Sequence, residues 1–330
     1  KEMMDWDAKY PRRDMGNGKV RGIGVAMAMQ GSSIAGVDVG GADIKLNEDG
    51  SYTLALGCTD MGTGCDTIMA QIAADCLNTP MDNIVVFSVD TDISPYDSGS
   101  YASSTTYLTG MAAVKACEQL RERIIALAAV RMNKDASTLT FDGENVIDES
   151  DGAKMSLFDI ATASMCNNEI SLEVTYSHSS PVSPPPFMAA CAEIEADPET
   201  GAIELLDYTA CVDCGTVVNT NLARVQTEGG LLQGIGMTLY EDIWYDERGK
   251  NLSNSFMQYK VPSRLDTDRI RVEFDSSYEP TGPFGAKSIG EIVINTPAPA
   301  IADAVYNATG VWINELPITP EKILKGMKVI

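Results

Sequence analysis

The sequence has almost no histidine, the side chain most often used in metal sites and nucleophile–base pairs. Its 330 residues include one histidine, His178, in the polar run 176–180. A multi-histidine zinc site, a di-iron bundle site and an HExxH protease are therefore excluded, and a Ser-His-Asp triad would have to use this single imidazole. Chemistry in this chain must come from a carboxylate, a thiol or a bound cofactor.

Basic residues and long apolar runs are also scarce. The chain has 24 lysines and arginines against 47 acidic residues, a formal net charge of −23. Such a charge repels phosphate backbones and anionic lipids, so binding to nucleic acid or to a membrane surface is disfavoured. No apolar run reaches the roughly 18 residues of a transmembrane helix. Residues 1–6 are polar and lack the apolar core of a secretory signal, so we expect a cytoplasmic protein.

The eight cysteines do not indicate a disulfide framework in a chain of this length. Cys211 and Cys214 form a lone CxxC pair, and a four-thiolate site would need a second closely spaced pair, which the sequence lacks. A redox pair or half of a metal site remains open, but a buried structural role is favoured.

Hydrophobic periodicity predicts strands and helices that alternate irregularly and include hairpins. The expected strands are 22–30, 42–46, 52–56, 84–89, 189–196, 203–210 and 270–274. The expected helices are 65–77, 107–132, 156–167, 221–240 and 300–308. This pattern favours an α+β fold of mixed sheets with packed helices over a doubly wound parallel sheet. Because the proline run 183–186 is the strongest break, we expect two lobes, residues 1–180 and 181–330.

Three loop-to-helix junctions rich in glycine and hydroxyl residues are candidates for an anion site: 62–67, 98–106 and 285–291. Free backbone N–H groups at a helix start bind anions, and hydroxyls add donors. Ordinary helix capping explains any one of them, and none is a P-loop or a Rossmann glycine motif. Three such junctions in one chain suggest a large anionic ligand.

Glu291 lies between Gly290 and the apolar residues Ile292 and Val293, at an expected helix start. Burial there would suit a general base working near neutral pH. The alternative is a carboxylate that only stabilises the helix start through the helix dipole, and the local sequence favours this alternative.

The order and spacing of four motifs resemble the molybdenum hydroxylases, the family of xanthine oxidase and aldehyde oxidoreductase. The motifs are 60–64 followed by 69–71, 102–105 followed by 109–110, 226–234, and 286–291. Each motif is weak alone, but the four occur in the family's order, and the resemblance extends from about residue 21 to about residue 308.

The resemblance implies a molybdenum molybdopterin cofactor, in a cytosine dinucleotide form and with a terminal sulfido or selenido ligand. The pterin dithiolene and inorganic ligands hold the metal, so no protein metal ligand is expected. Glu291 matches the family's catalytic glutamate. The residues implied to bind the cofactor are Gly62, Thr63, Gly64, Ala102, Ser103, Ser104, Thr105 and Gln226. Thr63 stands where the family often has glutamine, which puts its side-chain contact in question but leaves backbone contacts in place.

The resemblance also implies a reaction, the hydroxylation of an electron-poor aromatic N-heterocycle with water as the oxygen source and Glu291 as the base. Because the family's full catalytic subunit is roughly twice as long, the chain is interpreted as its C-terminal half. In this respect it resembles the medium molybdopterin subunit of nicotinate dehydrogenase, and conversion of nicotinate to 6-hydroxynicotinate is the preferred reaction. The first lobe would then bind molybdopterin, and the second would carry the catalytic glutamate.

The expected partners are a large molybdopterin subunit carrying the N-terminal half, an iron–sulfur subunit with 2Fe-2S clusters and an FAD subunit. A purine, another N-heterocycle or an aldehyde remains open as the substrate within the same family. A non-catalytic scaffold subunit is the alternative from another class, and it predicts loss of the glutamate or of the hydroxyl loop. Both are present, as Glu291 and residues 103–105.

Overall fold

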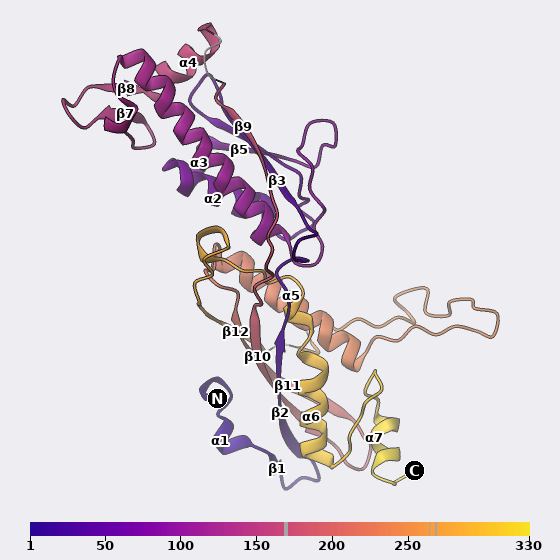
Figure 1. Ribbon diagram of the computed structural model, residues 1–330. Helices are drawn as coiled ribbons and strands as arrows, with labels where there is room; N and C mark the ends of the chain where they lie inside the picture. The colour runs from indigo at the N-terminus through magenta and orange to yellow at the C-terminus, as the bar shows by residue number, and fades with distance from the viewer. Residues whose placement is uncertain (168–170, 264, 268) are drawn as a thin grey trace.

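The computed structural model describes residues 1–167, 171–263, 265–267 and 269–330, and the chain forms an elongated body with two lobes (Figure 1). The upper lobe has a sheet of order β5-β4-β3-β9 and a smaller sheet, β6-β7-β8. The lower lobe has a sheet of order β1-β2-β10-β11-β12. Several mixed sheets with helices packed on them confirm the α+β fold class that the sequence predicts.

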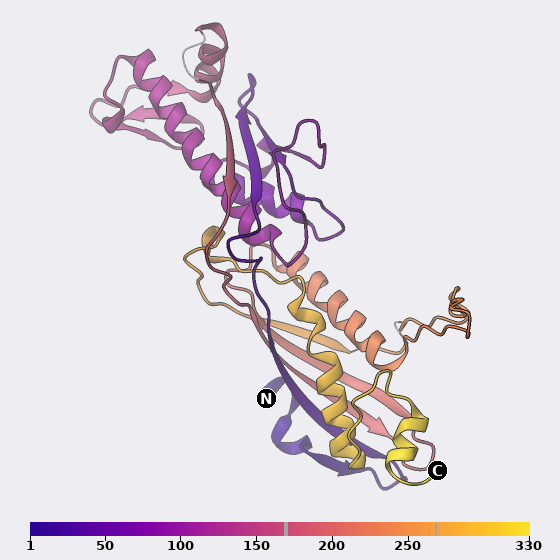
Figure 2. The ribbon, with the colours of Figure 1, turned by 45° about the vertical axis from the view of Figure 1, so that its right-hand side comes forward.

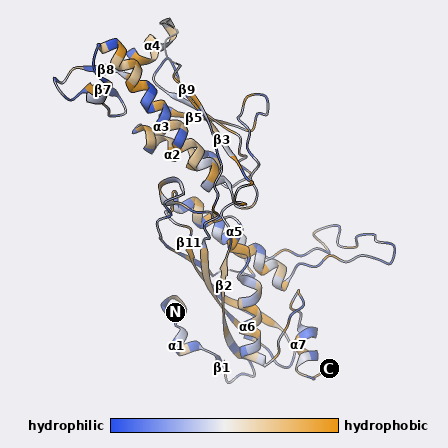
Figure 3. Ribbon diagram, viewed as in Figure 1, coloured by the Kyte–Doolittle hydropathy of each residue, from blue (hydrophilic) through white to orange (hydrophobic). Residues whose placement is uncertain are grey.

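The upper lobe packs two helices against its larger sheet. Its strands are β3 (Gly40–Leu46), β4 (Tyr52–Leu56), β5 (Ile84–Ser88), β6 (Leu139–Phe141), β7 (Asn145–Asp148), β8 (Lys154–Ser156) and β9 (Glu173–His178). Its helices are α2 (Cys65–Leu77), α3 (Thr105–Met132) and α4 (Leu157–Asn167). Figure 3 shows hydrophobic and hydrophilic residues alternating along α3. Leu120, Ile124 and Leu127, which helical spacing places on one face of α3, are fully buried.

The lower lobe places α5 and α6 against its sheet. Its strands are β1 (Arg12–Asp14), β2 (Val20–Met29), β10 (Phe187–Ala196), β11 (Ile203–Asp213) and β12 (Ile270–Asp275). Its helices are α1 (Trp6–Lys9), α5 (Thr220–Leu239), α6 (Pro297–Thr309) and α7 (Pro320–Gly326). Short 3-10 turns lie at Glu2–Met4, Met81–Asn83, Ala136–Thr138, Pro283–Gly285 and Ile292–Ile294. A second core, separate from that of the upper lobe, lies between the sheet and the helices.

The start of the chain lies in the lower lobe. β2 pairs antiparallel with β10, from Met29 opposite Phe187 to Val20 opposite Ala196. Residues 20–29, which were expected in the first lobe, thus lie in the same sheet as β10, because strand pairing and not chain order sets the place of a strand in a sheet. The chain crosses between the lobes in both 30–39 and 179–186. The assignment of cofactor binding and catalysis to separate lobes stays a prediction.

Besides short elements, the strand β9 and a long segment after α5 have no counterpart in the expected elements. β9 contains the polar run around His178 and pairs with β3, from His178 opposite Gly40 to Glu173 opposite Lys45. Between α5 and β12, residues 241–263, here called the arm, extend away from the lower lobe (Figure 1). Among the described residues, no helix is both long and apolar enough to cross a membrane.

Candidate functional site

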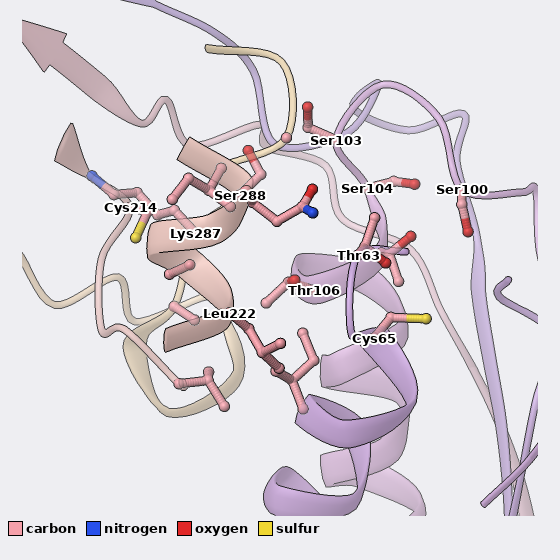
Figure 4. A pocket seen from close by; sticks show the side chains of 18 of the residues that line it. Thr63, Cys65, Ser100, Ser103, Ser104, Thr106, Cys214, Leu222, Lys287 and Ser288 are labelled. Carbon is pink, nitrogen blue, oxygen red and sulfur yellow. The ribbon is translucent and has the colours of Figure 1, made fainter. Parts of the chain in front are cut away.

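The three glycine and hydroxyl junctions meet at a cavity of about 400 Å³, together with the first turns of α5 (Figure 4). The predicted site residues that line it are Thr63, Ala102, Ser103, Ser104, Thr105, Gln226 and Glu291. Gly62 and Gly64 do not line the cavity, but they form the turn that carries Thr63. The structure therefore gathers residues from four motifs that are up to 228 positions apart in the sequence, from Thr63 to Glu291.

The loop before α3 reaches the cavity in a conformation that ordinary residues rarely adopt. Ala102 and Ser103 both have left-handed backbones, with φ of +47° and +54°. Such a conformation costs about 1–2 kcal/mol for each residue that is not glycine. Contacts outside the loop hold it there: the Ser33 N–H donates to the Ala102 carbonyl at 3.0 Å, and the Tyr101 hydroxyl donates to the buried carboxylate of Asp38.

α3 begins directly at the cavity and offers unpaired donors to it. Ser104 is the N-cap, and the first hydrogen bond of the helix runs from the Leu108 N–H to the Ser104 carbonyl at 2.8 Å. The preceding N–H groups have no helical acceptor, and the Thr105 and Thr106 side chains line the same cavity. Amide and hydroxyl donors at the start of a 28-residue helix form a favourable place for an anionic group.

Glu291 is exposed at the edge of this cavity, where Ser103 holds it. The Ser103 hydroxyl donates to Glu291 Oε2 at 2.9 Å and accepts from the Glu291 N–H at 3.0 Å. Gln30 Nε2 lies 3.4 Å from the same carboxylate oxygen. Backbone and side chain of Glu291 are thus fixed by one hydroxyl, so its carboxylate has a defined orientation beside the hydroxyl loop.

The expected burial of Glu291 is wrong, and the expected helix start is only a short turn. Ile292 and Val293 point into the lower core and are buried, which leaves the preceding carboxylate facing outward. Glu291 is the N-cap of a three-residue 3-10 turn, and α6 starts only at Pro297. The dipole of a long helix therefore does not act on this carboxylate directly.

The turn that carries Thr63 is tied to α5. Gln226 Nε2 donates to the Gly62 carbonyl at 3.1 Å, so this predicted cofactor residue is already bound to another predicted segment. Asp60 accepts from the N–H groups of Gly62 and Gly64 at 2.9 and 3.1 Å. Burial tends to raise the pKa of Asp60, but these amide donors outweigh it and lower the pKa. The turn is thus internally braced, with the Thr63 side chain left facing the cavity.

A buried lysine at the cavity was not predicted as a site residue. Lys287 is 6% exposed, and its Nζ lies 3.0 Å from both Asp213 Oδ2 and Ser277 Oγ. Burial tends to raise the pKa of Asp213, but hydrogen bonds from the Gly215 N–H, Ser277 and Lys287 lower it. The ammonium is therefore neutralised by a carboxylate. Its role is to fix the 285–291 junction to β11 rather than to supply an unpaired cation.

The donor set of the cavity suits a metal that an organic cofactor brings with it. The lining offers one carboxylate, Glu291, the thiols of Cys65 and Cys214, and no imidazole. Burial and the nearby charge of Asp213 raise the pKa of Cys214 to about 11, so it is a neutral thiol near neutral pH. Cys211 is exposed, so the expected buried role of the CxxC pair holds for Cys214 alone. The volume and the hydroxyl loops fit a large anionic ligand.

Comparisons with known proteins give one family and many relatives. Residues 1–268 match the family model described as the molybdopterin cofactor-binding domain. The whole chain aligns with 34% of the length of a probable hypoxanthine oxidase of Escherichia coli K12, at 38% identity. It also aligns over its whole length with 43% of the nicotine 6-hydroxylase large subunit of Paenarthrobacter nicotinovorans, at 28% identity. Among solved structures, quinoline 2-oxidoreductase from Pseudomonas putida 86 has a similar fold, with a TM-score of 0.87 and 26% identity. The match covers 95% of this chain and 42% of that protein's chain.

The chain thus spans between a third and a half of the length of these relatives. Sequence reasoning missed two residues that this geometry adds to the site. Gln30 lies outside the four motifs, and Lys287 lies inside the motif 286–291 without being singled out there. Their roles depend on partners that lie 261 and 74 positions away, which only the fold brings near.

Proposed function

Because the chain belongs to the molybdopterin cofactor-binding family of xanthine dehydrogenases and aldehyde oxidoreductases, we propose that it forms part of the active site of a molybdenum hydroxylase. The observation that carries this proposal is the reciprocal pair of hydrogen bonds between Ser103 and Glu291 at a cavity lined by three hydroxyl-rich junctions. An oriented carboxylate beside a cavity of this kind supports a site for a large anionic cofactor.

In this proposal the residues of the chain bind, orient and exchange a proton. The N–H groups at the start of α3, with Ser104 and Thr105, hold the anionic part of the cofactor, and the braced turn around Thr63 closes the opposite wall. When bound, the cofactor supplies the redox chemistry of hydroxylation. The Glu291 carboxylate accepts the proton of the water-derived oxygen nucleophile, and Ser103 keeps Oε2 in the required direction.

The substrate we propose is an electron-poor aromatic N-heterocycle, with nicotinate as the first candidate. Relatives named for hypoxanthine, nicotine and quinoline support a heterocycle, whereas others are named for aldehydes and carbon monoxide. The cytosine dinucleotide form of the cofactor, its sulfido or selenido ligand and a cytoplasmic location belong to the same proposal. So do separate large molybdopterin, iron–sulfur and FAD subunits; relatives are named as a subunit of a dehydrogenase complex, a large subunit and a large chain.

The decisive experiment replaces Glu291 with glutamine in the assembled enzyme. Because Gln keeps the shape and the hydrogen bond from Ser103 but cannot take up a proton, turnover is expected to fall by about 100- to 10,000-fold. Molybdenum content and thermal unfolding should stay as in the wild type. The assay measures all three on one preparation, with nicotinate, hypoxanthine, quinoline and an aldehyde as substrates.

Glu199→Gln is the matched control, because Glu199 is an exposed carboxylate in the turn between β10 and β11, outside the cavity. It should leave turnover unchanged. An assembled wild-type enzyme that holds no molybdenum would refute the cofactor assignment. Turnover of the Glu291→Gln enzyme within about threefold of the wild type would refute the role of the base while leaving the cofactor site in place.

A further inference from the structure

One face of the lower sheet carries large apolar side chains that no described part of the chain covers. Alternate residues of β2 point away from α6, and they are strongly exposed: Val25 44%, Met27 81% and Met29 68%. The register places Met29 opposite Phe187, which is 47% exposed, and Met27 opposite the exposed Ala189. We call Val25, Met27, Met29, Phe187 and Ala189 the open face.

The same sheet face is covered at its other end, so exposure is confined to this part. The chain start lies against that end (Figures 1 and 2), where Met4 and Ile23 are each 1% exposed. Lys9 and Arg13 pair there with the buried Glu193. Contiguous exposed apolar surface of this kind marks an interaction site in most proteins.

β2 pairs with β10 along one edge, but its other edge has no described strand beside it at this point. Its odd-numbered residues direct their N–H groups to the outer edge, where Ile23 donates to the Pro11 carbonyl and Val25 to Asp303 Oδ2, at 3.3 and 3.0 Å. The N–H groups of Met27 and Met29 point to the same edge, because alternate residues of a strand do so. Within the described residues, neither N–H has an acceptor there. Native proteins cover such edges because they otherwise promote aggregation.

The open face reaches the cavity of the proposed active site at one point. Phe187 lies beneath Lys287, 5.5 Å from ring centre to Nζ, and Lys287 lines the cavity. Gln30, which contacts Glu291, follows Met29 and belongs by strand alternation to the opposite face, the one that α6 covers. A polypeptide seated on the open face would therefore approach the cavity at Lys287.

Charge decides between a second copy and a different partner. Beyond β10, the same face continues to Glu273 and Asp275 on β12, which are opposite Cys211 and Asp213 and are both exposed. Two copies of a chain with a net charge of −23 would bring these acidic rims together, which disfavours self-association. A partner with an apolar centre and basic side chains toward β12 is complementary instead.

We infer that the open face binds the remaining part of the molybdopterin subunit, a polypeptide with an apolar docking surface flanked by lysine or arginine. This inference rests on the proposed function. The relatives support it, because they carry more than half of their length outside the match with this chain, which is enough polypeptide to cover such a face. Seated there, it lies beside the cavity at Lys287.

The test uses the native complex with a photo-crosslinking amino acid, p-benzoylphenylalanine, at Met27. The matched control position is Val130, equally apolar and 62% exposed, but on α3 in the upper lobe. Crosslinked peptides are identified by mass spectrometry. Efficient crosslinking from Met27, but not from Val130, to a polypeptide of the molybdopterin subunit is the expected result. Crosslinks to a second copy of this chain, or none from Met27, would overturn the inference.

A second measurement tests the energetics. Met27→Asp with Met29→Asp should weaken assembly by about 100-fold or more, because it places two charges in an apolar interface, and Val130→Asp should not. Glu273→Lys should weaken assembly by about tenfold at low salt and less at high salt. Circular dichroism checks that each variant is folded. A complex that contains molybdenum but assembles equally well with the double variant refutes this surface and leaves the proposed function intact. A crosslinked complex without molybdenum refutes the proposed function and leaves the surface.

Discussion

At the scale of single residues, the site depends on two adjacent left-handed residues, Ala102 and Ser103. Their backbone conformation is unfavourable in itself, and the fold maintains it through the contacts of Ser33 and Asp38 with the loop. The result is that one hydroxyl meets both the N–H and the carboxylate of Glu291. Ser103 therefore combines an unfavourable backbone conformation with the hydrogen bonds that orient Glu291. Substitutions at residues 103 and 102 should separate the effects of the two.

Ser103→Gly is predicted to lower turnover by about 10- to 100-fold, since a hydrogen bond to a charged group is worth about 1.5–3 kcal/mol. The free energy of unfolding should stay within about 1 kcal/mol of the wild type, because glycine relieves the left-handed backbone while the hydroxyl contacts are lost. The pH profile of turnover and the chemical denaturation curve of the same preparation are the two measurements.

Ala102→Gly is the control for this prediction. It relaxes the neighbouring left-handed backbone without removing a side-chain donor, so stability should rise slightly and turnover should not change. If Ala102→Gly impaired turnover as much as Ser103→Gly, loop rigidity rather than the Ser103 hydroxyl would be the controlling feature.

Much of the site at this scale was predictable from the sequence, although its internal contacts were not. The hydroxyl loop, the glycine turn, Gln226 and Glu291 are recognisable as short motifs, and seven of the predicted residues do line one cavity. The hydrogen bonds of Ser103 with Glu291 join residues 188 positions apart. The exposure of Glu291 depends on how Ile292 and Val293 turn into the core. Neither these hydrogen bonds nor this exposure can be read from a local sequence pattern.

At the scale of elements, the contact between β2 and α6 determines how closely the lower lobe packs. A Cβ atom at Gly24 would lie 2.2 Å from the Ala300 carbonyl oxygen and 2.3 Å from the Ala304 nitrogen. These are backbone atoms of a buried helix, which cannot move aside as the end of a side chain can. Gly24 is therefore needed for the close approach of helix and strand.

Gly24→Ala is accordingly predicted to lower the free energy of unfolding by about 3 kcal/mol, as overpacking in a rigid core does. Gly229→Ala is the matched substitution on α5, where a Cβ atom meets nothing within 4 Å. It should raise stability by about 0.5–1 kcal/mol, because alanine favours a helix interior more than glycine does. Urea denaturation of both variants measures the difference, and equal effects of the two would refute the packing argument.

Helices and strands with strong periodicity were predictable within a few residues. The strand expected at 52–56 and the helix expected at 65–77 match β4 and α2, and α3 starts only two residues before its expected position. β9 was missed because Thr175 and Ser177 alternate with partly buried residues in a segment without a run of apolar side chains. Pairing with β3 stabilises this strand, and such pairing is a tertiary interaction that local sequence does not encode.

At the scale of the whole molecule, the two lobes have separate cores and meet at the cavity. The sequence indicated a break near the prolines at 183–186, and β10 does begin directly after them. It gave no indication that the chain crosses between the lobes a first time within 30–39. β2 pairs with a strand that comes much later in the chain. A boundary drawn at one point along the sequence therefore could not assign β2 to the lower lobe.

The arm is the part of the molecule that the two cores do not need. Phe256 and Met257 are 80% and 81% exposed, and regular pairing within the described part of the arm is limited to a single bridge between Tyr245 and Asn251. The residues that flank it, Tyr240 and Ile270, both pack against the lower core. Both ends are thus fixed, while the hydrogen bonds described for residues 243–261 join residues of the arm to one another, so the arm can open without breaking either core.

Thermolysin, which cuts before large apolar residues, is therefore predicted to cleave the isolated chain first within residues 243–261. The two fragments should stay together at the mass of the intact chain, 35.4 kDa, and unfold at a temperature within a few degrees of the uncut protein, because neither core is broken. Val130 is the internal control. It is 62% exposed but lies in the regular backbone of α3, so it should resist cleavage if local opening of the backbone, and not exposure alone, directs the protease. Early cleavage at Val130 would show that exposure alone directs the protease. Separation of the fragments after a cut in the arm would show that the arm contributes to the stability of the lower lobe.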